Sequence, residues 1–346
     1  MPRRRSKSSL SKTLTSMWRK MAKSTARSTS QAIRNTISST FKNTPGLGKA
    51  GSVKTKRTAL HGTLAGLALG KTGARRYRIY QPAGVRKTER LPLIVMLHGC
   101  GQDADALARC SRMNKLAESR RFLVLYPEQD RTANSQNCWN WFSTRSGRAQ
   151  REVESIQAAV EQICLLYPVD PARIAVAGLS AGAGMAALLA TRYPARYRAV
   201  AMHSGVAPGR AHSSATAMAA MRGRGPAGAL PASILPGSAL PALLVIQGSE
   251  DRVVALVNGR HAAQMWAAQW HAAPTAARQV QRGQRYPAMV TDYRAHGRIV
   301  VSLCEVQGLG HAWSGGPAGQ PYSDPKGPDA SAMIWAFANR QFTLVS

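Results

Sequence analysis

Apolar and polar positions alternate along the chain in blocks that predict an α/β fold. From about residue 74 onward, short apolar runs typical of strands buried on both faces alternate with longer segments whose apolar residues recur at helical spacing. The predicted strands cover residues 77–81, 93–97, 122–126, 174–177, 199–202, 242–246 and 300–306. The predicted helices cover residues 106–119, 153–166, 183–191, 261–270 and 331–337. Strands joined by helical crossovers form a parallel sheet, so we expect a mostly parallel central sheet with helices on both faces.

Two stretches depart from this alternation. Residues 1–60 form an arm rich in Ser, Thr, Lys and Arg, and the arm precedes one predicted α/β domain over residues 61–346. Residues 207–240 are dominated by Ala, Gly, Pro, Ser and Arg and show little periodicity. This second stretch lies between two predicted strands, so we expect it to be either a lid or an ordinary surface excursion.

Charge distinguishes the arm from the rest of the chain. The formal net charge is +31, and no Asp or Glu precedes Glu89, so the basic character is partly a property of the arm. Apolar residues of the arm fall at helical spacing, namely Leu10, Leu14, Met17, Trp18 and Met21. Such a basic amphipathic helix could bind an anionic surface, a lipid-coated particle or nucleic acid, and a solvated tail is the alternative. We see no apolar run of signal-peptide length and no segment near the ~20 apolar residues that span a bilayer.

A pentapeptide near the middle of the chain indicates a nucleophile. Gly178-Leu179-Ser180-Ala181-Gly182 has the pattern Gly-x-Ser-x-Gly and stands between the predicted strand at 174–177 and the predicted helix at 183–191. This strand–turn–helix context is that of the nucleophile elbow of α/β-hydrolases. The flanking glycines permit the tight turn, which exposes Ser180 above the sheet. The N–H of Ala181, at the helix N-terminus, is then available to an oxyanion.

The serine needs a base to accept its proton. In α/β-hydrolases the acid and then the base follow the serine along the chain. His311 lies in a glycine-flanked loop after the last predicted strand, and we expect it to be the base. His261 and His271 fall within or beside a predicted helix and His296 precedes the last strand, so these three suit the role less well.

The base in turn needs an acid that orients it. Asp251 follows the predicted strand at 242–246, at the strand end where open α/β sheets collect their functional groups. We expect Asp251 to be this acid, and the neighbouring Glu250 is the alternative.

The oxyanion hole needs two N–H donors. We assign one to Ala181 and the other to Cys100, in the loop after the predicted strand at 93–97, which makes His98 a structural residue and not a second base. No C-x-x-C pair or zinc-type Cys/His spacing occurs among the cysteines, which are Cys100, Cys110, Cys138, Cys164 and Cys304. The loops of Cys100 and Cys138 should flank the nucleophile, so the chain has either one disulfide there or five reduced thiols.

Six separated motifs together resemble the polyhydroxybutyrate (PHB) depolymerase family of serine esterases. The resemblance covers roughly residues 74–340 in motif order. The motifs are His98-Gly99-Cys100, Tyr126-Pro127-Glu128-Gln129, Cys138-Trp139-Asn140-Trp141-Phe142, Val169-Asp170-Pro171-Ala172-Arg173, Ala177-Gly178-Leu179-Ser180-Ala181-Gly182 and Gly310-His311-Ala312-Trp313-Ser314-Gly315-Gly316.

This resemblance implies an α/β-hydrolase fold and a triad of Ser180, Asp251 and His311, with Cys100 and Ala181 at the oxyanion hole. It implies no metal and no cofactor. The implied substrates are short-chain polyhydroxyalkanoate esters or their oligomers, and relatives in the same broad group cleave feruloyl or acetyl esters of plant polysaccharides.

Substrate contacts and location are further expectations. Trp139, Trp141 and Trp313 could line an apolar cleft for a polyester backbone, although tryptophans commonly serve as core residues. The absence of a visible signal peptide favours a cytoplasmic protein that acts on an intracellular granule or on soluble oligoesters, whereas extracellular action is common in the family. A competing function class is a non-catalytic protein that binds a granule or nucleic acid through its arm, with nucleic acid less favoured as the main partner.

Overall fold

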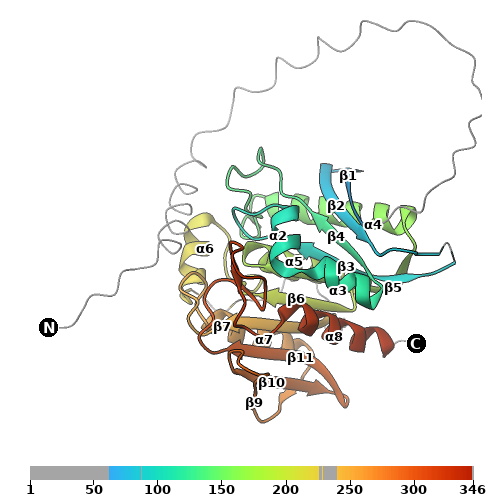
Figure 1. Cartoon of the computed structure of the whole chain (residues 1–346). Helices are drawn as coiled ribbons and strands as arrows, with labels where there is room; N and C mark the ends of the chain where they lie inside the picture. The colour runs from blue at the N-terminus through green and yellow to red at the C-terminus, as the bar shows by residue number, and fades with distance from the viewer. Residues whose placement is uncertain (1–61, 87, 226–227, 229–239, 345–346) are drawn as a thin grey trace, which may run out of the picture.

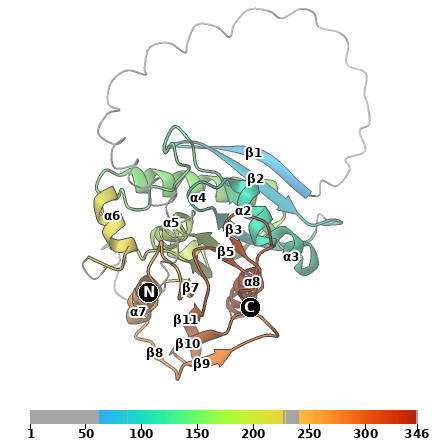
Figure 2. The same ribbon diagram turned by 60° about the vertical axis from the view of Figure 1, so that its left-hand side comes forward.

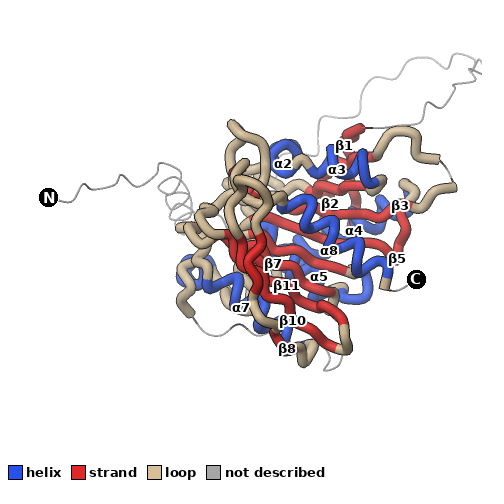
Figure 3. Tube along the Cα trace, turned by 60° about the horizontal axis from the view of Figure 1, so that its bottom comes forward, coloured by secondary structure: helices blue, strands red, loops and turns tan. Residues whose placement is uncertain are grey.

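The computed structural model of the chain describes residues 62–86, 88–225, 228 and 240–344 (Figure 1). Their central feature is a sheet of eleven strands with helices on both faces (Figure 3). From one edge to the other its strands are β1 (Gly62–Gly70), β2 (Gly73–Gln81), β4 (Leu123–Pro127), β3 (Leu91–Leu97), β5 (Val169–Leu179), β6 (Ala199–His203), β7 (Ala242–Gly248), β11 (Arg298–Val306), β10 (Ala288–Ala295) and β8 (Ala273–Pro274), and β9 (Arg278–Val280) also pairs with β10. The middle of the sheet, from β4 to β11, is parallel, and both of its edges are antiparallel.

Two apolar layers fill the spaces between the sheet and the helices. Successive residues of a strand point to opposite faces, so Val95 belongs to one layer and Ile94 and Met96 belong to the other. One face carries α4 (Arg148–Leu166), α5 (Ala181–Arg192) and α7 (Val257–Gln269), and the other carries α2 (Ala104–Ser111), α3 (Met113–Arg120) and α8 (Ala330–Thr343). The expected α/β-hydrolase architecture is therefore confirmed.

The predicted helix over residues 106–119 is wrong in one respect, because the structure has two helices there. Arg112 adopts a left-handed backbone with φ of 54° between α2 and α3. Leu107 and Cys110 are buried on α2, and Met113 and Ala117 are buried on α3. These apolar positions keep a spacing of three or four residues across the break, so periodicity alone could not reveal it.

Several elements were absent from the sequence prediction. Strands β1 and β10, which lie toward the two edges of the sheet (Figure 2), have positions that alternate in burial instead of forming apolar runs. Helix α6 (Ser214–Met221), capped by Ser213 and Thr216, lies within the predicted excursion at 207–240. The rest of the molecule adds the short helix η1 (Pro194–Arg196) and a small sheet of β12 (Trp313–Ser314) and β13 (Ser323–Asp324).

Some predictions fall on residues outside the described part. These are the arm at 1–60, and residues 226–227 and 229–239 of the excursion. The domain boundary near residue 60 and the choice between lid and surface excursion therefore stay predictions. In the part of the chain that is described, none of the helices combines the length and the apolar character needed to span a bilayer.

Candidate active site

Ser180 occupies the sharp turn between β5 and α5. Its backbone has φ of 57° and ψ of −117°, a region that a residue with a Cβ rarely adopts, and its N–H donates to the carbonyl oxygen of His203 at 2.8 Å. A Cβ on Gly178 would collide with the backbone of Gly182, and a Cβ on Gly182 would collide with the carbonyl oxygen of Leu97. The two flanking glycines are thus required by close backbone approach, as the elbow pattern predicts.

Asp251 and His311 meet above the same edge of the sheet. Asp251 follows β7 and His311 follows β11, the next strand along, so both lie at carboxyl ends of parallel strands. His311 Nδ1 is 2.8 Å from Asp251 Oδ2, and the other carboxylate oxygen accepts the N–H groups of Val253 and Val254 at 2.9 and 2.8 Å. Glu250 is exposed, and its backbone N–H donates to the Leu309 carbonyl. Of the two acids considered, the structure brings Asp251 to the histidine.

The carboxylate of Asp251 is held in its ionised form. Burial acts to raise the pKa of Asp251, but the charge and hydrogen bond of His311 and the N–H groups of Val254 and Val253 outweigh it and leave the pKa below its ordinary value. The ionised carboxylate accepts the Nδ1–H of His311, which leaves Nε2 of the imidazole as the basic nitrogen. Within the described part of the chain no hydrogen bond joins Ser180 Oγ to His311, and this contact commonly tightens only when substrate binds.

The N–H groups of the loop after β3 differ in whether they have a partner within the protein. The N–H of Gly99 donates to Gln102 Oε1, that of Gly101 to the Gln136 carbonyl and that of Gln102 to the Gly99 carbonyl. No described residue accepts the N–H of Cys100. A Cβ placed on Gly99 would lie 3.6 Å from the Cβ of Ser180, so this loop runs beside the nucleophile.

The start of α5 holds the second N–H group that the sequence analysis assigns to the oxyanion hole. Ala181 is the first residue of this helix, and an N–H in the first turn has no intrahelical acceptor. The N–H groups of Cys100 and Ala181 thus have no acceptor among the described residues, and both belong to segments beside Ser180.

A disulfide joins Cys100 to Cys138, with their Cα atoms 4.2 Å apart. Of the two cysteine arrangements that the sequence left open, the structure has the one with this cross-link. Cys110, Cys164 and Cys304 are free thiols. The cross-link fixes the Cys100 loop to the segment that leads into α4.

A buried polar network beneath this disulfide was not anticipated from the sequence. The side chain of Gln129 accepts from Arg75 at 3.0 Å and donates to Glu152 at 2.8 Å and to the Cys138 carbonyl at 2.9 Å. Asn140 donates its backbone N–H to Glu152 at 2.8 Å. Burial raises the pKa of Glu152, while its hydrogen bonds oppose that shift. Gln129, Cys138 and Asn140 belong to two motifs noted in the sequence, but Arg75 and Glu152 come from other parts of the chain, so no single motif signals the network.

His98 is a structural residue of this network, as expected from the sequence. It is fully buried, its Nδ1 is 2.9 Å from the Gly99 carbonyl, and its Nε2 accepts the N–H of Gln129 at 3.1 Å. Its ring lies against Trp139 with centroids 5.3 Å apart. Burial lowers the pKa of His98 to about 4, so the imidazole is neutral at physiological pH.

The three tryptophans predicted to contact substrate lie in the protein interior. Trp139, Trp313 and Trp141 are 0%, 1% and 4% exposed, respectively. Trp313 stacks on His203, and Trp141 packs edge-on against Phe142. Enclosed rings offer almost no surface to a polymer, so the described geometry supports the core role that the sequence analysis gave as the alternative.

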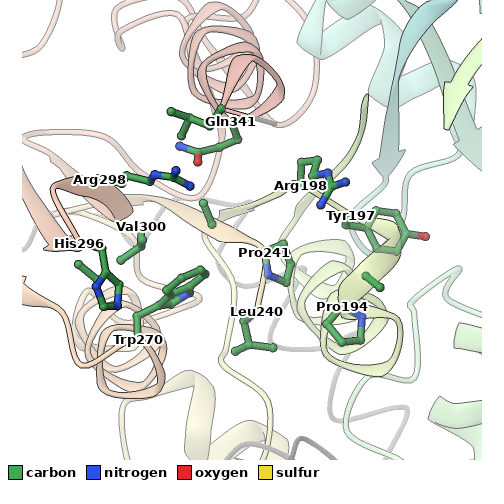
Figure 4. Close-up of a pocket in the computed structure, with 14 residues that line it drawn as sticks. Pro194, Tyr197, Arg198, Leu240, Pro241, Trp270, His296, Arg298, Val300 and Gln341 are labelled. Atoms are coloured by element: carbon green, nitrogen blue, oxygen red, sulfur yellow. The ribbon is translucent and has the colours of Figure 1, made fainter. Parts of the chain in front are cut away.

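A cavity of about 720 Å³ lies away from this site (Figure 4). It is lined by Arg198, Pro241 and Arg298, which lie at the amino ends of β6, β7 and β11, together with Trp270 and Gln341. Ser180, Asp251 and His311 lie at the carboxyl ends of their strands, so the cavity and the candidate site lie at opposite ends of the parallel strands. No group of three or more His, Cys, Asp or Glu that could hold a metal ion occurs among the residues with described positions.

Known proteins resemble the chain in sequence over its central part. The profile of the esterase PHB depolymerase family matches residues 75–285. Poly(3-hydroxyalkanoate) depolymerase C of Paucimonas lemoignei is 41% identical over 104 residues, which are 30% of this chain and 25% of that protein. Feruloyl esterase B of Neurospora crassa is 32% identical over 132 residues, which are 38% of this chain and 44% of that protein. The chain thus matches less than half the length of these relatives.

A solved structure resembles the fold over a longer part of the chain. The acetyl xylan esterase from Aspergillus awamori superposes with a TM-score of 0.57 at 20% identity, covering 72% of this chain and 93% of that one. This likeness supports the α/β-hydrolase fold, and the family profile covers more than half of the chain. The chain therefore belongs to the esterase PHB depolymerase family.

Proposed function

We propose that the protein is a carboxylic-ester hydrolase in which Ser180, His311 and Asp251 form the catalytic triad. The observation that carries the proposal is the 2.8 Å contact of His311 Nδ1 with a buried, ionised Asp251, on the same sheet edge as the strained Ser180 turn. An orienting acid on one imidazole nitrogen leaves the other free to activate a hydroxyl. This arrangement argues against a purely non-catalytic binding protein.

The reaction proceeds in two steps. His311 Nε2 takes the proton of Ser180 Oγ while this oxygen attacks the ester carbonyl, and the N–H groups of Cys100 and Ala181 stabilise the oxyanion. The imidazolium then gives its proton to the leaving alcohol, and an acyl-enzyme remains on Ser180. Water, deprotonated by the same nitrogen, attacks the acyl-enzyme. The imidazolium then returns its proton to Ser180 Oγ as the carboxylic acid is released and the free enzyme is restored.

The substrate class that we favour is a poly(3-hydroxybutyrate) or other short-chain polyhydroxyalkanoate, or its soluble oligoesters. Support comes from the family profile and from the 41% identity to a poly(3-hydroxyalkanoate) depolymerase. Feruloyl or acetylxylan ester hydrolysis is the second candidate, supported by the feruloyl esterase relative and the acetyl xylan esterase fold. Comparing turnover of amorphous poly(3-hydroxybutyrate), a feruloylated sugar and acetylated xylan decides between the two.

We also propose that the arm at residues 1–60 contacts an anionic or granule surface. The support is its charge, since it carries many Lys and Arg residues and no acid. This contact would concentrate the enzyme on its substrate without taking part in catalysis.

The decisive experiment for the hydrolase is the Ser180→Ala variant, assayed with p-nitrophenyl butyrate. Loss of a nucleophile that acts with its base should lower kcat by a factor on the order of 10⁶, with the fold kept. Ser119→Ala, at the exposed end of α3, is the matched control and should behave as wild type. Retention of more than a few per cent of activity by Ser180→Ala would exclude Ser180 as the nucleophile.

A further inference from the structure

His203 ends β6, the strand that lies between the strand of the nucleophile and the strand of the acid. Its carbonyl oxygen accepts the N–H of Ser180 at 2.8 Å, so its main chain already touches the elbow. Its side chain is fully buried. The mechanism given above makes no use of this imidazole.

The side chain of His203 reaches the loop that carries the base. Its Nε2 is 3.1 Å from the backbone N of Ser314, three residues after His311, and its ring stacks on Trp313 with centroids 5.2 Å apart. An N–H can only donate, so Nε2 of His203 must be the unprotonated nitrogen. The proton then sits on Nδ1, which is 3.1 Å from Ser204 Oγ.

The ring of His203 is suited to remain neutral through the catalytic cycle. Burial and, second, repulsion from His311 lower the pKa of His203 to about 3. Protonation would also place an N–H against the N–H of Ser314. When His311 becomes an imidazolium, His203 can therefore hold its neighbour in place without adding a second charge.

From these contacts we propose that His203 is a positioning residue that holds the loop of His311 against the elbow of Ser180. The inference rests on the proposed triad and extends it. One residue spans both halves of the site, with its carbonyl on the nucleophile and its Nε2 on the base loop. A shift of about 1 Å in a catalytic group can cost about 100-fold in rate, so a residue at this junction can control turnover without touching substrate.

The test compares two substitutions that differ in whether they offer the N–H of Ser314 an acceptor. His203→Phe keeps a ring against Trp313 but removes the acceptor for Ser314, whereas His203→Gln can place an amide oxygen near the position of Nε2. We expect His203→Phe to lower kcat for p-nitrophenyl butyrate roughly 10- to 100-fold, with KM changed less than about twofold. His203→Gln should recover most of this loss, although both variants alter the same buried site.

A second readout follows the base directly. The proton between His311 Nδ1 and Asp251 should give a downfield NMR resonance that is assigned by its loss in Asp251→Asn. We expect the resonance to persist in wild type and His203→Gln and to broaden or vanish in His203→Phe. The NMR measurement decides the proposal even if the wild-type protein hydrolyses no ester. Such a lack of hydrolysis would overturn only the proposed function.

The outcomes that overturn the inference are specific. Equal kcat values for the Phe and Gln variants, or an unchanged resonance in His203→Phe, would show that the ring only fills space. If His203→Phe does not fold, Ser204→Ala takes its place, because it removes the Nδ1 partner and leaves the buried ring intact. Ser204→Ala should weaken the same resonance and lower kcat several-fold, and wild-type values for both would overturn the proposal.

Discussion

The two sides of the nucleophile strand share a buried histidine packed against a tryptophan, but different contacts hold each side in place. On the oxyanion side, which comprises residues 98–102, 129–140 and Glu152, the buried imidazole of His98 lies against Trp139 and accepts a main-chain N–H from a distant loop. On the base side, which comprises residues 203–204, 249–254 and 308–314, His203 stacks on Trp313 and does the same. The strands that carry these histidines, β3 and β6, flank β5. Both imidazoles are neutral by burial.

The difference lies in how each side is locked. The oxyanion side adds a disulfide and a buried polar network around Arg75, Gln129 and Glu152. On the base side the buried acid is Asp251, whose carboxylate contacts His311. Oxyanion donors work best when they are fixed before the reaction, since they then reorganise little as charge develops. A base must gain and lose a proton, so its side gains more from one well-oriented carboxylate than from rigidity.

The base side should therefore be the more sensitive to a single charge. Asp251→Asn should lower kcat by a factor on the order of 10⁴, because an amide in place of the carboxylate no longer holds His311 in the productive tautomer. Glu250→Gln is the matched control, since the neighbouring Glu250 is exposed, and it should stay near wild type. The check is steady-state hydrolysis of p-nitrophenyl butyrate. Equal and mild losses in both variants would mean that another acid serves the base.

The oxyanion side should instead respond mainly in stability. The double variant Cys100→Ala/Cys138→Ala removes a cross-link between residues 38 apart in sequence. Loop-closure entropy predicts that this loss lowers the free energy of unfolding by about 2–4 kcal/mol. We expect the midpoint of chemical unfolding to fall accordingly. We expect kcat to fall less than about tenfold, because the bonds of Gly99, Gly101 and His98 still hold the loop.

Reductant provides the control for this variant. Cys164→Ala removes a free thiol on α4 and keeps the disulfide, so dithiothreitol should destabilise this variant as it does wild type. Dithiothreitol should not destabilise the double variant further. A loss of kcat as large as that of Asp251→Asn would remove the distinction between the two sides. The concentration of reductant needed also shows whether the bond would survive in a reducing compartment.

The triad candidates could be found in the sequence because each follows a buried strand. Continuous apolar runs locate the parallel strands, and residues just after such strands meet at one edge of the sheet. This reasoning placed Asp251 and His311 near Ser180 without a structure. It favoured Asp251 and left Glu250 as the alternative, because adjacent residues of a turn point in different directions that only the backbone of the turn determines.

The supporting residues could not be found in the same way. His203 and Ser314 are 111 residues apart, and a buried histidine at a strand end has no pattern of its own. Strands β1 and β10 were missed because their positions alternate in burial and neither strand forms a continuous apolar run. For the tryptophans the sequence left a cleft and a core role open, and the structure packs Trp139 and Trp313 against the two buried imidazoles and Trp141 against Phe142.

Removal of the arm changes neither the oxyanion side nor the base side, so it should leave both intact. Deleting residues 1–60 should leave kcat and KM for p-nitrophenyl butyrate within about twofold of wild type, because no triad, oxyanion or supporting residue lies there. Binding to anionic vesicles and to polyhydroxybutyrate granules should weaken. The reason is electrostatic, since exposed charges act over a Debye length of ~8 Å at physiological ionic strength.

Sedimentation with granules, anionic vesicles and neutral vesicles at low and high salt measures this effect. Full-length protein should pellet with the anionic surfaces at low salt and should lose part of that binding as salt screens the Lys and Arg residues. A salt-resistant remainder is expected if the apolar side of Leu10, Met17 and Met21 inserts into the surface. Equal pelleting of full-length and truncated protein would leave the arm without a binding role. Loss of soluble-ester hydrolysis on truncation would instead mean that the catalytic domain begins before residue 61.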